Sequence, residues 1–144
     1  MTCSRVPFAG VVTASLSLVA WATAAVAGAA ETPPLEGTAW VLAELPGRTL
    51  PAGAVATLRF DRERVTGHDG CNPFAVPYKA EGGTIEVIFE GPSTTMDCPP
   101  ERTEIAHVFV TALEGARTYK IEGGRLRLLA MGGDVLVTLA RAAR

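Results

Sequence analysis

The chain has 144 residues, of which 48% are hydrophobic and 19% are charged, and its formal net charge is -2 at pH 7. This length supplies one domain, which is large enough to bury a hydrophobic core without a metal or a disulfide framework. The mild charge excludes nucleic-acid binding through a basic surface, because the nearest approach to a basic patch, Arg59, Arg62 and Arg64, flanks an expected turn.

The first 30 residues predict a secretory signal peptide. Arg5 is their single charged residue, a run rich in Ala, Ser, Thr and Gly follows, and Ala25-Val26-Ala27 fits the pattern that signal peptidase reads. A retained membrane helix is the alternative, but the small residues make this run weakly apolar. Cys3 precedes the run, so it cannot carry the lipid of a mature lipoprotein. We expect a periplasmic or secreted protein with no stable membrane insertion once residues 1–30 are removed.

A short tether is expected at residues 31–34, where Pro33 and Pro34 mark a change in composition, and a single domain at residues 35–144. Apolar and polar side chains alternate along the first half of this domain, as they do in half-buried antiparallel strands. The Gly82-Gly83 pair is typical of a tight two-residue hairpin. Strands are predicted at 38–44, 55–60, 64–67, 74–80 and 84–90.

The next predicted element is a helix over residues 101–114. Acidic Glu101 and Glu104 favour its N-terminus, where the helix dipole stabilises negative charge. Pro99-Pro100 fits the start of the helix, and Gly115 can end it. The apolar side chains that recur at the three-and-four spacing of one helical face are Ile105, Val108, Phe109, Ala112 and Leu113.

The chain ends in further strands, predicted at 118–122, 125–130 and 134–139. Gly123-Gly124 and Gly132-Gly133 separate them and again predict tight two-residue hairpins. The order of elements therefore predicts an α+β fold. We expect a curved, half-barrel-like antiparallel sheet of about seven or eight strands, whose concave face is covered by one helix.

The stretch TGHDGCNPF raises the question of whether Cys71 is a nucleophile, a metal ligand or half of a disulfide. Once Cys3 leaves with the signal peptide, Cys71 and Cys98 are the two cysteines that remain. An exported protein pairs two cysteines more often than it keeps two free thiols. We therefore predict a Cys71–Cys98 disulfide that joins the loop around Gly70 to the start of the helix.

Zinc is the alternative for the cysteines, and its four ligands would be His68, Cys71, Cys98 and His107. The spacing lacks a paired C-x-x-C motif. His68, beside Asp69 and Gly70, is typical of a turn, and His107 falls on the polar face of the predicted helix. We expect no metal and no cofactor.

Hydrolytic chemistry has no support in the residues. Ser93 is the single serine after the signal peptide, and it lacks the glycines of a nucleophile elbow. Glu86 and Glu90 fit the solvent face of a strand better than a catalytic pair. The sequence therefore predicts a protein that is not an enzyme.

From residue 35 to residue 139 the chain resembles the META domain family, also called HslJ-like. The elements that carry the resemblance include Trp40, Gly67-x-x-Gly70-Cys71-Asn72, Thr94-x-Met96-x-Cys98, and Glu104 with Phe109. The resemblance implies a small bacterial envelope protein associated with heat shock, novobiocin resistance, or motility and secretion, in a class with no established enzymatic activity. This chain departs from the lipoprotein members because it has no lipobox cysteine.

Two hypotheses for function remain. The favoured one is a non-catalytic envelope protein that supports stress tolerance through contacts with an unknown envelope protein or a small ligand. The alternative is a binder of a small apolar molecule inside the curved sheet. A candidate surface site near the joined loops would hold short polar side chains, although such side chains also satisfy local backbone groups in turns. Its residues are Asp69, Asn72, Thr94, Thr95 and Asp97.

Overall fold

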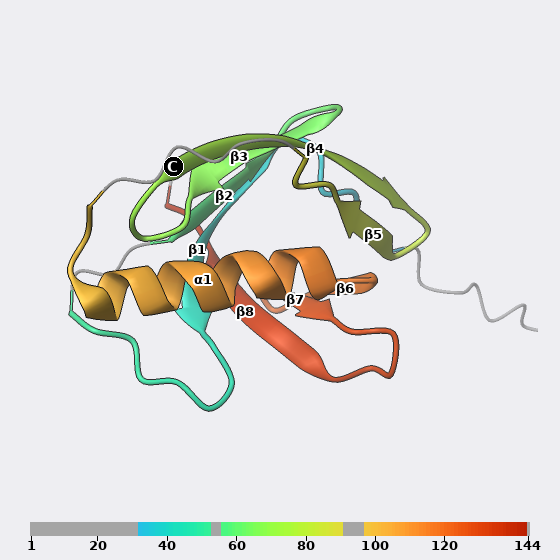
Figure 1. Ribbon diagram of the computed structural model, residues 1–144. Coiled ribbons are helices and arrows are strands. Elements are labelled where there is room, and N and C mark those ends of the chain that lie inside the picture. The colour runs from blue at the N-terminus through green and yellow to red at the C-terminus, as the bar shows by residue number, and fades with distance from the viewer. Residues whose placement is uncertain (1–31, 53–55, 91–96, 144) are drawn as a thin grey trace, which may run out of the picture.

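The computed structural model describes residues 32–52, 56–90 and 97–143. Within these ranges eight antiparallel strands form a closed barrel, and one helix packs against it (Figure 1). The expected α+β class, an antiparallel sheet packed by one helix, is confirmed, and the sheet curves far enough to close on itself. The elements are β1 (Thr38–Glu44), β2 (Thr57–Phe60), β3 (Arg64–His68), β4 (Pro73–Glu81), β5 (Thr84–Val87), α1 (Pro100–Gly115), β6 (Thr118–Glu122), β7 (Arg125–Leu129) and β8 (Val135–Arg141).

The signal peptide predicted at residues 1–30 lies outside the described residues. Within the described ranges, no helix combines the length and the apolar composition that crossing a membrane requires.

Each strand pairs with its neighbour along the chain, and β8 closes the barrel by pairing with β1. The β4–β5 connection is the two-residue turn that the sequence predicts, and Gly82 and Gly83 in it have φ values of 57° and 86°. The β6–β7 connection is built alike, with φ values of 57° at Gly123 and 73° at Gly124. A type I′ turn requires positive φ at both central residues, which glycine adopts without steric cost, and this turn matches the twist of the strands.

The third predicted two-residue hairpin, at Gly132-Gly133, is wrong. Five residues, 130–134, lie between the end of β7 at Leu129 and the start of β8 at Val135. The Ala130 N–H donates to the Asp134 carbonyl at 2.9 Å, and Gly133 is the member of the pair with a positive φ, 91°. The Ala130–Asp134 hydrogen bond leaves a three-residue loop, 131–133, which needs one left-handed residue, so the backbone requires glycine at 133 and not at 132.

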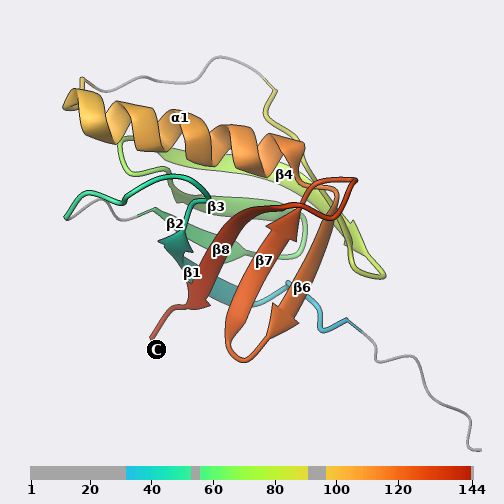
Figure 2. The same ribbon diagram turned by 90° about the horizontal axis from the view of Figure 1, so that it is seen from below.

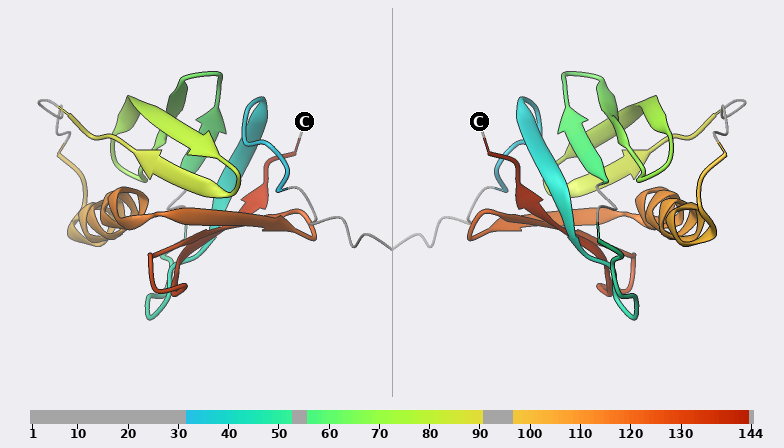
Figure 3. Two further views of the ribbon diagram at one scale, coloured as in Figure 1. Left: turned by 90° about the vertical axis from the view of Figure 1, so that its right-hand side faces the viewer. Right: turned by 90° about the vertical axis from the view of Figure 1, so that its left-hand side faces the viewer.

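The barrel is narrowly closed between β5 and β6. These strands share one paired position, Thr84 with Thr118, and the Ile85 N–H donates to the Arg117 carbonyl at 2.9 Å beside it. Within the described residues, the pairing between β5 and β6 does not continue past this position. The helix α1 packs there instead, against β5, β7 and β8. Figures 2 and 3 show the helix lying across the side of the barrel, between β3–β5 and β6–β8.

The helix covers this gap with its predicted apolar face. It begins after Pro99, whose carbonyl accepts the N–H groups of Arg102 and Thr103, and it ends at Gly115. The face turned to the barrel is buried, and each large apolar side chain on it stabilises the fold by about 1.5–3 kcal/mol. Its buried residues are Ile105, Ala106, Phe109, Ala112 and Leu113.

Large side chains fill the interior of the barrel. An eight-stranded barrel is about wide enough for side chains alone to occupy it. The largest fully buried side chains come from the strands, from the helix and from the segment before β1, so they form one continuous core. They are Trp40, Phe60, Phe109, Leu35, Leu58, Leu113, Leu126, Leu128, Leu139, Val65 and Val137.

The segment before β1 is held against the barrel. Leu35 belongs to the core, and the Tyr119 hydroxyl donates to the Pro33 carbonyl at 3.1 Å. A second tyrosine, Tyr78, donates its hydroxyl to the Asp61 carbonyl at 2.7 Å. Burial raises the pKa of both phenols above the ordinary value of 10.0, so both remain neutral donors at neutral pH.

Candidate functional site

The loop between β3 and β4 is joined to the start of α1 by a disulfide. Cys71 and Cys98 form this bond with their Cα atoms 6.0 Å apart, although they are 27 positions apart in sequence. The predicted pairing is confirmed. It uses both sulfur atoms, so neither cysteine is a free nucleophile and the four-ligand zinc set is not assembled.

Asp69 organises the loop that carries Cys71. Its Oδ1 atom accepts the N–H groups of Cys71 at 2.7 Å and of Asn72 at 2.5 Å, and its own N–H donates to the Asn72 carbonyl at 2.9 Å. Only 8% of the residue is exposed, so Asp69 does not present a recognition surface, and the alternative reading, a side chain that satisfies local backbone groups, holds. The carboxylate turns inward because two backbone donors in the tight loop need an acceptor.

Replacing Asp69 with alanine is expected to lower the free energy of unfolding by about 1–2 kcal/mol, the scale for losing a side chain that caps backbone N–H groups. Asp69→Asn is the matched control, because its amide oxygen can still accept both N–H groups and should retain most of the stability. Urea unfolding of the three proteins measures the difference. Equal stability of Asp69→Ala and the parent protein would contradict this role.

The two histidines lie on different elements, β3 and α1. His68 ends β3, and its Nδ1 atom accepts the Gly70 N–H at 3.0 Å, as the turn interpretation predicts. Gly70 itself has a φ of 105°, a conformation that glycine tolerates. His107 lies exposed on the outer face of α1. Among the described residues, no three His, Cys, Asp or Glu side chains gather where they could hold a metal ion.

The remaining residues of the predicted surface site divide into two groups. Asn72 is half-buried and Asp97 is exposed, and the Cys71–Cys98 bond places them on neighbouring loops. Thr94 and Thr95, together with the motif residue Met96, lie outside the described residues, as does Ser93.

Two further motif residues have structural roles in the barrel. Trp40 is fully buried, its Nε1–H donates to the Thr38 hydroxyl at 2.7 Å, and the Arg141 guanidinium lies 5.0 Å from its ring centroid. Gly67 lies in β3 where that strand approaches β2, and a Cβ atom there would be 2.0 Å from the Thr57 carbonyl oxygen. Trp40 is therefore a core aromatic residue, and Gly67 allows two strands to approach closely.

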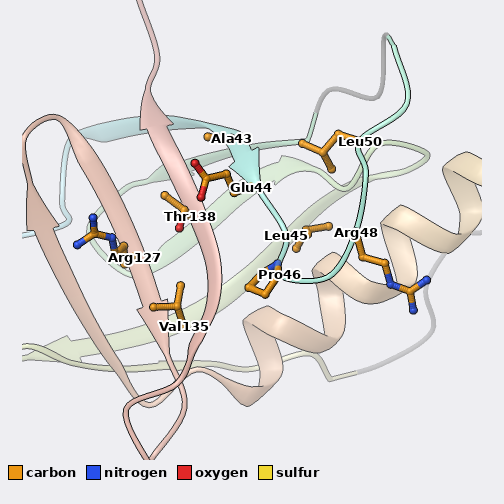
Figure 4. Close-up of a pocket in the computed structure, with 9 residues that line it drawn as sticks. All are labelled: Ala43, Glu44, Leu45, Pro46, Arg48, Leu50, Arg127, Val135 and Thr138. Atoms are coloured by element: carbon orange, nitrogen blue, oxygen red, sulfur yellow. The ribbon is translucent and has the colours of Figure 1, made fainter.

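A separate cleft, which the sequence did not reveal, opens on the outer surface of the barrel. The β1–β2 loop forms one wall and the outer faces of β7 and β8 form the other, and the open space between them is about 590 Å³ (Figure 4). Because its residues come from distant parts of the chain, no local motif marks it. The one available signal is Thr138, a polar side chain in the apolar strand β8.

A sequence model of the META domain matches residues 33–143. The chain belongs to the META domain family. No curated protein is significantly similar to this META-domain protein in sequence.

Solved structures share the fold of this META-domain protein at low sequence identity. An NMR structure of a protein from Burkholderia xenovorans is 22% identical, covers 76% of this chain and 85% of its own, and has a TM-score of 0.62. A crystal structure of a DUF4847 family protein from Bacteroides vulgatus is 14% identical, covers 76% and 96% of the two chains, and has a TM-score of 0.58. Identities this low establish a common architecture and leave the function open.

Proposed function

We propose that this META-domain protein is an exported, non-catalytic protein that supports envelope stress tolerance through contacts with a protein partner. The observation that carries the proposal is the Cys71–Cys98 disulfide. Disulfides persist in oxidising compartments and are rare in the reducing cytosol. The predicted signal peptide at residues 1–30 supports the same compartment.

The disulfide joins the β3–β4 loop to the segment before α1, and these two segments are called the stapled loops below. Their chemistry supports a role in contacts and not in catalysis. The two thiols are bonded to each other, the Asp69 carboxylate accepts backbone N–H groups, and the His68 Nδ1 atom is occupied by a backbone donor. A general acid, a general base or a nucleophile would need such a group facing a substrate. Here these groups shape the loops instead, and Asp97 remains exposed beside them.

The alternative, a small apolar molecule inside the curved sheet, has less support. Trp40, Phe60 and Phe109 occupy the interior with no exposed surface. A ligand there would have to displace packed core side chains. Losing the packing of one large core side chain costs about 2–5 kcal/mol. Contact through the outer surface requires no such rearrangement.

Fractionation of the native host, followed by N-terminal sequencing and non-reducing mass spectrometry, tests the compartment. The protein should be recovered from the envelope or the medium with an N-terminus near residues 28–31 and one intramolecular disulfide. An N-terminus at Met1, a lipid-modified N-terminus, or two alkylatable thiols would contradict the proposal.

Photocrosslinking in intact, heat-stressed cells tests the partner. A photoreactive amino acid at Asp97 should capture one envelope protein, whereas the same amino acid at Lys120, an exposed position on β6, should not. Asn72→Ala separates the two roles of its loop. A recognition role predicts lost capture with an unchanged melting temperature, whereas a structural role predicts a lower melting temperature. Equal capture from Asp97 and Lys120, or no capture from Asp97, would rule out this surface.

A further inference from the structure

The cleft between the β1–β2 loop and β8 has apolar walls. Leu45 is buried in the core at its base, Pro46 and Leu50 line the loop side, and Val135 lines the strand side (Figure 4). Val135 is 37% exposed, which is high for a large aliphatic side chain in a strand. The volume of about 590 Å³ lies in the range of small-molecule sites, about 300–1,000 Å³. These walls favour an apolar ligand body.

The charged side chains of the cleft are already compensated. Each of the three has an oppositely charged neighbour outside the lining, and in Figure 4 the guanidinium groups of Arg48 and Arg127 point away from the centre. Because each charged side chain of the cleft is already paired, the cleft has no net charge for a ligand to neutralise. Charge complementarity therefore favours an uncharged ligand. The ion pairs are Glu44 with Arg125, Arg48 with Glu104, and Arg127 with Glu122.

Thr138 supplies one polar group at the floor. The residue is 5% exposed, and its hydroxyl makes no side-chain hydrogen bond to the described residues. No fully buried side-chain oxygen among those residues lacks a hydrogen-bond partner, so the Thr138 hydroxyl oxygen keeps some exposed surface, and Thr138 lines the cleft. Strand pairing places it between Glu44 on β1 and Arg127 on β7. A bound molecule could therefore form one hydrogen bond at the floor.

We propose that this cleft binds a small, uncharged and mainly apolar molecule that forms one hydrogen bond with Thr138. The site shares no residue with the stapled loops, so it goes beyond the proposed contact function and does not depend on it. It also differs from a ligand site inside the sheet, because the occupant would rest on the outside of the barrel without disturbing the core.

Fluorescence titration with N-phenyl-1-naphthylamine tests the site, because this probe is uncharged, has two apolar ring systems and carries one N–H donor. We expect saturable binding of one probe to the folded chain. Val135→Asp should weaken binding at least tenfold, since it puts a charge on the apolar wall at a position exposed enough to tolerate it. Thr138→Val, which keeps the shape and removes the hydroxyl, should weaken binding about 3- to 10-fold.

Met131→Asp is the matched control, because Met131 is 85% exposed on the neighbouring loop and does not line the cleft. It should bind the probe as the parent protein does. Circular dichroism of each variant establishes that it is folded, and Val135→Asp decides the outcome if Thr138→Val fails to fold. Absence of saturable binding, or unchanged binding by Val135→Asp, would overturn the proposal.

Discussion

Replacing Cys71 or Cys98 with serine is expected to lower the free energy of unfolding by about 3.5 kcal/mol. The bond closes a loop between residues 27 positions apart, and the chain-entropy model assigns about this value to a loop of that length. Either substitution removes the same closure, so both variants should lose nearly the same stability. The loss should be measured by urea unfolding of the oxidised proteins.

The parent protein in the presence of a reductant is the control for the disulfide. Its stability should fall to that of the serine variants, and the double variant Cys71→Ser/Cys98→Ser should be no less stable than either single variant. Strongly unequal losses would show that one cysteine stabilises the fold through packing. Cys71 is the candidate for such an effect, because it is 5% exposed whereas Cys98 is half-buried.

Gly67→Ala is expected to destabilise the protein by about 3 kcal/mol, at the upper end of the usual cost of overpacking. The added Cβ atom would lie 2.0 Å from the Thr57 carbonyl oxygen and 3.1 Å from the Phe74 ring. The backbone at Gly67 is not left-handed, so lack of space and not conformation is the cause. Relief requires β2 and β3 to move apart, which weakens the strand pairing that places Thr57 opposite His68.

Gly132→Ala provides the matched control for Gly67→Ala. A Cβ atom at Gly132 would meet its nearest neighbour, the Asp134 side chain, at an ordinary 3.7 Å, and the backbone there is also not left-handed. Its stability should remain within about 0.5 kcal/mol of the parent protein. Thermal unfolding of the two variants side by side gives the comparison. A Gly67→Ala variant as stable as Gly132→Ala would contradict the close-approach role.

The fold could be predicted because local patterns and tertiary packing agree along most of the chain. Residues 38–44 were predicted as a strand with the observed bounds, and the helix was predicted within one residue at each end. The strand predicted at 84–90 ends earlier, at Val87. Alternation alone cannot mark this end, because it depends on where α1 replaces the next strand beside β5.

Parts of the candidate site could not be predicted, because they depend on which way a side chain turns. Aspartate in a turn is usually exposed, but the Asp69 side chain points inward because two backbone N–H groups of the loop donate to it. Full closure of the barrel depends on pairing between β1 and β8, which lie at opposite ends of the domain. The cleft above Thr138 arises from the same long-range pairing.

The pairing of β1 with β8 also sets the order in which the protein can fold. A chain synthesised from its N-terminus can form the β1–β5 meander early, since those contacts are local. Trp40 nevertheless lacks a neighbour on one side until residues 135–141 arrive, and Arg141, which covers its ring, is almost the last residue of the domain. The core is therefore sealed by the final strand. A chain in which β8 has not yet paired with β1 therefore has an open barrel and an incomplete core.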